Sequence, residues 1–270
     1  MNQFSLIVTC KGRLGHLKQT LPRFMRQANT QVIVVDYSCP QNTGDFVETH
    51  FPKSKVVRVE NREYFNASAA RNAGAKIAQT PYLIFVDADT IVSDQFVTLL
   101  REHLTGSNFL RFHLPGSNSL GGSCVVATAD FHRVKGFDEV FSGYGGEDLD
   151  FYWRLQRMGT TLRVLSPENT IGWIKHGPKL RTAFYEVKDV KRSFLQARAY
   201  RLVKETVLGL RLEGELPLEE RRKIWNDVAE AIAEDRFEIK VRLPGNSTSG
   251  FLKEWNWKRE LVVSFERAVR

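Results

Sequence analysis

The stretch Tyr82-Leu-Ile-Phe-Val-Asp-Ala-Asp89 predicts a buried strand that ends in two carboxylates. An unbroken apolar run of this length is typical of a central strand in a parallel sheet, which is covered on both faces. Alternation along an extended chain places side chains i and i+2 on the same side, so Asp87 and Asp89 could hold a hard divalent cation together. Two solvated acids in a strand-end turn would explain the same residues without a metal.

The sequence before this stretch alternates between strand and helix patterns. Strands are expected at 4–9, 32–35, 55–59 and 82–86, and helices at 14–28, 43–51 and 66–79. This alternation predicts an α/β fold with a mostly parallel sheet flanked by helices. Ligands of such sheets bind at the carboxyl ends of the strands, where Thr9, Asp36 and Asp87 lie.

The pattern changes beyond residue 105. Further strands are expected at 109–114, 122–129 and 162–165, a helix at 148–158, a mainly helical extension from about 181 to 270, and a flexible loop at 245–250. We therefore expect a mixed sheet in residues 1–180, followed by a C-terminal extension of helices.

The net charge of +8 is concentrated in one segment. Residues 175–204 carry nine basic and two acidic side chains, and Phe184, Val187, Val190 and Phe194 form an apolar stripe at helical spacing. A basic amphipathic helix over 182–204 would suit an anionic membrane or a phosphate-bearing acceptor. A solvated helix face is the simpler interpretation.

Composition limits the class of protein. Hydrophobic residues make up 42% of the chain, which excludes a disordered protein, and no apolar run approaches the ~18 residues of a membrane span. Three cysteines without metal-type spacing favour a reducing compartment, and no signal peptide is recognised. We expect a cytoplasmic protein, with peripheral membrane contact as an option.

Other chemistry-bearing residues flank the expected strands. Glu147 and Asp148 follow a glycine-rich loop and begin a helix, where they could act as a general base or simply favour the helix dipole. His176 follows a short strand and could complete a cation site with Asp89, although a lone histidine is more often structural. Lys11 and Arg13 could meet phosphate or lie on the solvated surface.

Four segments together resemble a known family. They are Thr9-Cys-Lys-Gly-Arg-Leu-Gly-His-Leu17, the pieces Phe65-Asn66 and Arg71-Asn-Ala-Gly74, the motif Asp87-Ala-Asp89, and the run from Gly121-Gly122 through Gly136-Phe137 to Gly145-Gly-Glu-Asp148. In this order they resemble glycosyltransferases of the GT-A fold. The resemblance is strongest to the β-1,4-galactosyltransferase type and related bacterial family 2 enzymes, and it covers about residues 4–180.

The resemblance implies a role for each matched residue. Residues 1–105 would bind the nucleotide-sugar and 106–180 the acceptor. Asp36 would recognise uracil, Lys11 and Arg13 the diphosphate, and Thr9, Arg71 and Asp87 would complete the donor site. Asp89 and His176 would bind Mn²⁺ or Mg²⁺. Asp148 would be the catalytic base, and Glu147 would hold sugar or acceptor hydroxyls. Tyr144 stands where the family often has tryptophan.

The function implied is metal-dependent, inverting transfer of galactose or N-acetylgalactosamine from a UDP-sugar to a glycan or lipid-linked glycan, as in polysaccharide biosynthesis. A sugar-nucleotide nucleotidyltransferase is an alternative, although Cys10–Arg13 contains a single glycine. The basic charge also raises a nucleic-acid-binding or anionic-membrane-binding protein. No aromatic-and-basic RNA-binding pattern is visible, so no nucleic-acid partner is expected.

Overall fold

A computed structural model describes residues 2–113, 120–168, 170–210, 215–234, 236, 238–243 and 259–264. The chain forms two compact units. The first contains Met1–Ser142 and Glu147–Lys188, and the second contains Gly143–Gly146 and Asp189–Arg270. The loop expected at 245–250 lies outside the described residues.

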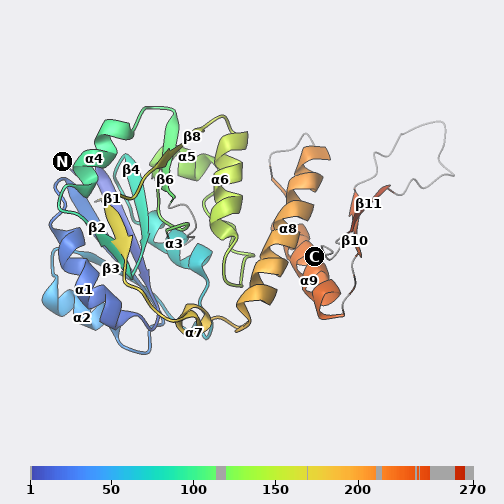
Figure 1. Cartoon of the computed structure of the whole chain (residues 1–270), viewed down its shortest axis with the longest axis horizontal. Coiled ribbons are helices and arrows are strands. Elements are labelled where there is room, and N and C mark those ends of the chain that lie inside the picture. Colours follow the sequence, from blue (N-terminus) through green and yellow to red (C-terminus); the bar gives the residue numbers. More distant parts are fainter. Residues whose placement is uncertain are drawn as a thin grey trace. The chain divides into compact units, whose positions relative to one another are not determined.

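A β-sheet flanked by helices forms the centre of the first unit (Figure 1). It has seven strands, in the order β3-β2-β1-β4-β7-β6-β8. The strands are β1 (Phe4–Cys10), β2 (Thr30–Tyr37), β3 (Lys55–Val59), β4 (Tyr82–Asp87), β6 (Asn108–Phe112), β7 (Cys124–Ala127) and β8 (Thr161–Leu165). β1 to β4 are parallel, and β7 runs antiparallel to both of its neighbours. The predicted mixed, mostly parallel sheet is confirmed.

Helices cover both faces of this sheet. Alternate residues of β1 point to opposite faces: Leu6 and Val8 belong to one core cluster and Ile7 to the other. The first cluster includes residues of α1 (Leu14–Met25), α2 (Thr43–His50) and α4 (Phe96–His103), and the second includes residues of α3 (Ala67–Lys76), α5 (Thr128–Arg133) and α6 (Glu147–Arg157). The strand expected to reach residue 129 ends at Ala127, where α5 takes over.

A two-stranded ribbon beside the sheet had no counterpart in the sequence prediction. β5 (Thr90–Val92) pairs antiparallel with β9 (Ile171–Trp173), so that Thr90 lies opposite Trp173. The Ile174 amide donates to the Asp89 carbonyl at 2.8 Å and extends the pairing. The ribbon brings the segment that carries His176 to the end of β4.

The segment after β9 is not the long helix that its apolar stripe predicted. It forms the short helix α7 (Pro178–Thr182), and the next helix begins only at Val190. Phe184 instead covers Gly12, where an added Cβ would lie 1.7 Å from its ring. The Phe184 carbonyl accepts a hydrogen bond from the Phe65 amide at 2.7 Å. The stripe drawn from Phe184 to Phe194 is therefore wrong.

The described residues of the second unit form two helices and a hairpin. α8 (Val190–Leu210) packs on α9 (Leu218–Ala233), with the rings of Tyr200 and Trp225 edge-to-face at 5.3 Å. β10 (Glu238–Leu243) pairs antiparallel with β11 (Arg259–Ser264). The predicted helical character is confirmed and the hairpin is an addition. None of the helices in the described part of the chain is long and apolar enough to cross a membrane.

Candidate active site

The predicted donor-site residues lie at one edge of the sheet. Thr9 is in register with Asp87, and Cys10 is in register with Asp36. Three neighbouring parallel strands therefore end together, as the sequence predicted, and their terminal side chains face the same end of the molecule.

Asp89 and His176 form a direct pair. His176 Nε2 lies 2.7 Å from Asp89 Oδ2, although 87 positions separate the residues in sequence. The β5–β9 ribbon explains this approach, because it pairs Thr90 with Trp173 and the Ile174 amide donates to the Asp89 carbonyl. A carboxylate oxygen and an imidazole nitrogen at this separation are suitable ligands for one divalent transition metal ion.

Helix α1 contributes two side chains, Thr20 and His16, to the surroundings of Asp89 and His176. Thr20 of α1 donates its hydroxyl to the Ala88 carbonyl at 2.8 Å, which fixes the chain between the two aspartates. The His16 ring lies 5.7 Å from that of His176, a neighbour for which its sequence context gave no sign. Burial raises the pKa of Asp89, and the charge of Asp87 raises it further. A bound cation would relieve both effects.

Arg71 links the end of β4 to the first turn of α6, the helix that carries the predicted base. Its Nη1 donates to Glu147 Oε1 at 2.8 Å, and its Nη2 donates to Asp87 Oδ1 at 3.2 Å. The Arg71 side chain is only 4% exposed. The resemblance implied a nucleotide contact for Arg71, whereas its hydrogen bonds here go to two acids.

Glycine makes room for this arginine. A Cβ on Gly122 would lie 2.6 Å from Arg71 Nη2, so Gly122 lets the backbone pass close to the guanidinium. The Gly121-Gly122 pair was a sequence signal for such an approach.

Burial raises the pKa of Glu147, the Arg71 charge opposes the rise, and the Asp148 charge adds to it. Glu147 Oε2 is buried without a hydrogen-bond partner.

Asp148 lies beside Glu147 in the first turn of α6 but is more exposed. Its Oδ1 accepts from the Leu149 amide at 2.8 Å. A partly exposed carboxylate in the first turn of a helix is accessible to a substrate. These properties suit a general base.

Lys11 is bound to the protein itself in this structure. Its Nζ donates to the carbonyls of Tyr37, Ser38 and Arg62 at 3.2, 2.9 and 2.7 Å. Burial lowers its pKa. The ammonium therefore ties the β1, β2 and β3 loops together, and its contact with a diphosphate stays a prediction.

Arg13 is oriented by the segment that follows His176. Its Nη2 donates to the Leu180 carbonyl at 2.7 Å, while Nη1 is buried without a hydrogen-bond partner. Its positive charge opposes the rise in the pKa of Asp89, which places the guanidinium within electrostatic reach of that carboxylate. Arg13 thus retains donor capacity near the paired acid and histidine.

Asp36 organises the loop that follows β2. Its Oδ1 accepts from the Cys39 amide at 2.8 Å and its Oδ2 from the Gly44 amide at 2.7 Å. Both oxygens are therefore engaged by the backbone. Recognition of uracil by Asp36 stays a prediction, and it would require these oxygens to accept a further hydrogen bond.

The ligand set favours an ion that is completed by substrate. Among the described residues, no group of three or more His, Cys, Asp or Glu side chains is placed to hold a metal. Two protein ligands leave the remaining positions to phosphate oxygens and water, an arrangement common where a cation binds together with a phosphorylated substrate. Asp89 and His176 fit such an ion.

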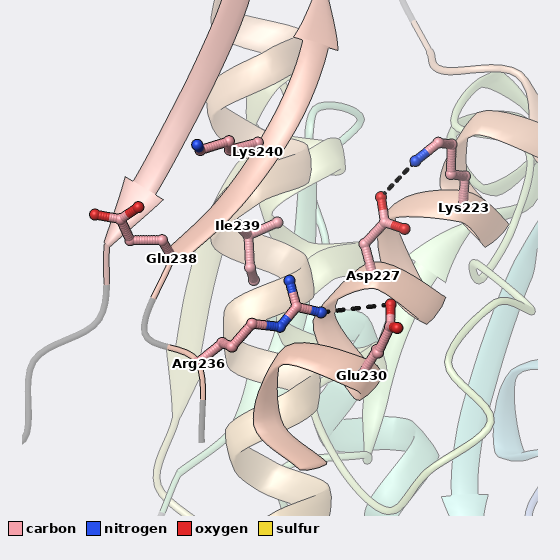
Figure 2. Close-up of a pocket in the computed structure, with 7 residues that line it drawn as sticks. All are labelled: Lys223, Asp227, Glu230, Arg236, Glu238, Ile239 and Lys240. Atoms are coloured by element: carbon pink, nitrogen blue, oxygen red, sulfur yellow. Dashed lines mark hydrogen bonds and ion pairs between the residues drawn. The ribbon is translucent and has the colours of Figure 1, made fainter. Parts of the chain in front are cut away.

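A cavity of about 550 Å³ in the second unit is lined mostly by charged side chains (Figure 2). Charged side chains of α9 and β10 line it, and Lys223 pairs with Asp227 at 2.7 Å and Arg236 with Glu230 at 3.4 Å. Because these charges neutralise one another at an open surface, we assign no chemistry to this cavity.

Two family models match consecutive parts of the chain. Residues 5–109 match "Glycosyl transferase family 2", and residues 101–178 match "N-terminal domain of galactosyltransferase". The predicted resemblance to GT-A glycosyltransferases of these two types is confirmed, and it covers the residues that build the strand-end site.

The curated relatives that match the chain include glycosyltransferases. Validoxylamine A glucosyltransferase of Streptomyces hygroscopicus subsp. jinggangensis (strain 5008) is 23% identical over 222 residues, covering 59% of this chain and 53% of the relative. Beta-1,4-galactosyltransferase 5 of Danio rerio is 26% identical over 189 residues, covering 67% of this chain and 48% of the relative. The chain thus spans about half the length of these relatives.

Solved structures share the fold. S. aureus TarS 1–349 in complex with UDP-GlcNAc gives a TM-score of 0.54 at 15% identity, covering 88% of this chain and 93% of that one. The Pyrobaculum calidifontis mannosyltransferase PcManGT in complex with GDP-Man and Mn²⁺ gives 0.55 at 15% identity, covering 86% and 73%. Both likenesses support the GT-A architecture of the first unit.

Proposed function

We propose that the chain transfers a hexose from a UDP-sugar to a hydroxyl of a glycan or lipid-linked glycan. The observation that carries this proposal is the Asp89–His176 pair at 2.7 Å, at the sheet edge where Asp87 also ends its strand. The matched families are glycosyltransferases, and relatives and neighbours are named for glucosyl, galactosyl and mannosyl transfer. Galactose or N-acetylgalactosamine is our first choice of donor sugar.

Asp89 and His176 would hold Mn²⁺ or Mg²⁺, which would supply positive charge to the departing diphosphate. Arg13 would add a hydrogen-bond donor to the same charge, because its Nη1 is buried without a partner. Asp148 would take the proton of the attacking acceptor hydroxyl, and Glu147 Oε2 would hold a neighbouring hydroxyl. One base and in-line attack would invert the anomeric carbon and give a β-linkage from a UDP-α-sugar.

The Asp148→Asn variant tests the assignment of the base. We expect transfer to fall by about 10²-fold or more, because the amide cannot accept the proton, while Mn²⁺-dependent UDP binding persists. A panel of UDP-sugars with Mn²⁺, followed by release of UDP, first identifies the donor.

Asp94→Asn is the matched control, since Asp94 is an exposed partner of Arg26. Near-normal turnover of Asp148→Asn would remove the base assignment. Absence of metal-dependent UDP binding and hydrolysis in the unaltered chain would contradict the proposed function itself.

We also propose that α8 contacts an anionic membrane that carries the acceptor. Lys191, Leu195, Arg198 and Leu202 recur at spacings of four, three and four along α8 and are all exposed, Leu195 and Leu202 by 49% and 47%. This spacing places them on one helix face, where cations alternate with apolar side chains. The membrane-contacting surface expected over 182–204 is therefore limited to this row in our proposal. Lys188 is excluded because it donates to backbone carbonyls, and Lys204 because it is fully buried.

A further inference from the structure

Two cysteines meet at the edge of the sheet where β1 and β2 end. Cys10 is the last residue of β1 and is in register with Asp36 of β2, three positions before Cys39. The Asp36 carboxylate accepts from the Cys39 amide at 2.8 Å, which fixes the loop that carries this thiol. Cys10 is fully buried, Cys39 is 7% exposed, and the two thiols lie within hydrogen-bonding reach of each other. Neither the family resemblance nor the proposed mechanism gives this pair a role.

Hydrogen-bond donors converge on the Cys39 sulfur. The Gly12 amide donates to Cys39 Sγ at 3.1 Å, and the Gln41 amide also donates to it. The Thr43 hydroxyl lies within reach of both sulfurs and is 3.4 Å from Cys10 Sγ. Because such donors favour a thiolate over a thiol, the hydrogen bond from Cys10 and these further contacts lower the pKa of Cys39 to about 5, against the opposing effect of burial. The hydrogen bond to Cys39 and burial raise the pKa of Cys10, which therefore keeps its proton.

A thiolate beside a protonated thiol can be oxidised in two steps. In the first step the Cys39 thiolate attacks one oxygen of a peroxide and the O–O bond breaks. Cys39 becomes a sulfenic acid, and the hydroxide that leaves takes up a proton to form water. In the second step the Cys10 sulfur attacks Cys39 Sγ, the S–O bond breaks, and the proton of Cys10 leaves with the hydroxide as a second water. One hydrogen peroxide thus oxidises two thiols to one disulfide.

We propose that Cys39 is a peroxide-reactive thiolate that Cys10 resolves, so that oxidation closes a Cys10–Cys39 disulfide beside the donor site and weakens donor binding. Two predicted donor contacts adjoin the pair, since Lys11 follows Cys10 directly and Asp36 holds the Cys39 amide. Joining the sulfurs draws the two loops together and displaces both of these side chains, and small displacements of binding groups are costly. The effect on the donor rests on the proposed function, whereas the disulfide itself does not.

Hydrogen peroxide is the probe, applied to the full-length chain after reduction and removal of the reductant. Peptide mass spectrometry without reduction should find Cys10 and Cys39 joined, with a mass lower by two hydrogen atoms, and dithiothreitol should reverse the change. Cys124 is the internal control. It is 1% exposed, and burial raises its pKa to about 12, so it should remain a thiol.

Variants separate the roles of the two cysteines. Cys10→Ala should stop at the sulfenic acid of Cys39, which dimedone captures, and Cys39→Ala should leave Cys10 unoxidised. Thr43→Val removes a hydroxyl from the thiolate and should slow oxidation severalfold. Thr49→Val makes the same change at an exposed position of α2 and is the matched control. Circular dichroism of each variant checks that it is folded.

A bridge that includes Cys124, dimedone on Cys10 in place of Cys39, or equal oxidation of all three thiols would overturn the proposal, as would the absence of any bridge. Calorimetry measures Mn²⁺-dependent UDP binding after the peroxide is removed. The affinity should fall about tenfold in the bridged chain, recover with dithiothreitol, and stay unchanged by peroxide in Cys39→Ala. Equal affinity of the bridged and reduced chains would overturn the effect on the donor. Absence of UDP binding in the reduced chain would instead contradict the proposed function, and mass spectrometry would still decide whether the disulfide forms.

Discussion

Arg71 is a buried cation whose charge is balanced by acids from two different elements. Removing it should leave the buried Glu147 carboxylate without the cation that compensates its charge. We expect Arg71→Met to lower the free energy of unfolding by about 3–5 kcal/mol, the usual cost of breaking a buried ion pair from one side. Urea denaturation of the metal-free protein measures this loss.

Glu147→Gln in the same chain is the second arm of this test. Because it removes the uncompensated charge, the double variant should recover a large part of the stability lost in Arg71→Met. Strictly additive losses would show that Arg71 and Glu147 do not stabilise each other. Arg26→Met, which breaks an exposed pair with Asp94, should cost no more than about 1 kcal/mol.

The position of a site residue could be predicted from the sequence where it depended on the pattern of a single strand. Asp87 and Asp89 follow an unbroken apolar run, and their placement at a sheet edge needed only the period of a strand. The partners of Arg71 were not predictable, because Glu147 lies 76 positions away and local sequence has no period over that distance. The same holds for Lys11, whose carbonyl partners come from two other loops.

At the scale of elements, α3 packs unusually close to the sheet. A Cβ on Gly74 would lie 2.5 Å from Ile7 Cγ2 and 2.9 Å from Val35 Cγ2. Gly74→Ala should therefore destabilise the protein by about 1–3 kcal/mol, because the added methyl group overpacks the core. The midpoint of urea denaturation should fall, with an unchanged slope.

Gly15→Ala is the matched control, because its added Cβ meets nothing within 4 Å and α1 gains a better helix former. We expect no loss of stability from it. A Gly74→Ala protein as stable as the unaltered chain would mean that α3 can move away from β1 and β2 without cost.

Long elements were easier to predict than short ones. The four parallel strands and helices α1, α2, α3 and α6 have enough residues to display a period, and they form near the expected positions. β5 and β9 have three residues each, and neither pairs without the other. The stripe from Phe184 to Phe194 matched a helix by spacing alone, but the packing of Phe184 on Gly12 prevails over that periodicity.

At the scale of the whole molecule, the net charge is +8, and two of the exposed cations, Lys191 and Arg198, lie in the row on α8. We expect the chain to bind vesicles that contain phosphatidylglycerol and not vesicles of phosphatidylcholine alone. Lys191→Gln with Arg198→Gln should weaken this binding ~30-fold, at about 1 kcal/mol for each cation near the surface. Co-sedimentation at low and high salt measures the effect.

Leu195→Ser with Leu202→Ser should weaken vesicle binding as well, because the apolar side chains of the row would no longer enter the lipid interface. Arg222→Gln removes an exposed cation from α9 and should change binding little. Equal affinity for the two vesicle types, or equal effects of all three variants, would leave a solvated helix face as the better interpretation.

The division of the chain could not be predicted from sequence alone. Composition and periodicity change near residue 181, which suggested a simple boundary there. In the structure four residues of the loop before Glu147 group with α8 and α9, because Gly143 and Gly145 admit Ser193 and Phe194. A boundary of this kind depends on contacts between distant segments, which no local pattern contains.

The β5–β9 ribbon has a consequence for how the protein is made. During synthesis Asp89, which follows β4, leaves the ribosome well before the histidine that pairs with it, since 87 positions separate them. The sheet's first four strands can pair in that interval, whereas the ribbon closes only when residues beyond 171 emerge. A nascent chain that stalls earlier would thus present the paired parallel strands without His176, the second residue of the proposed metal site.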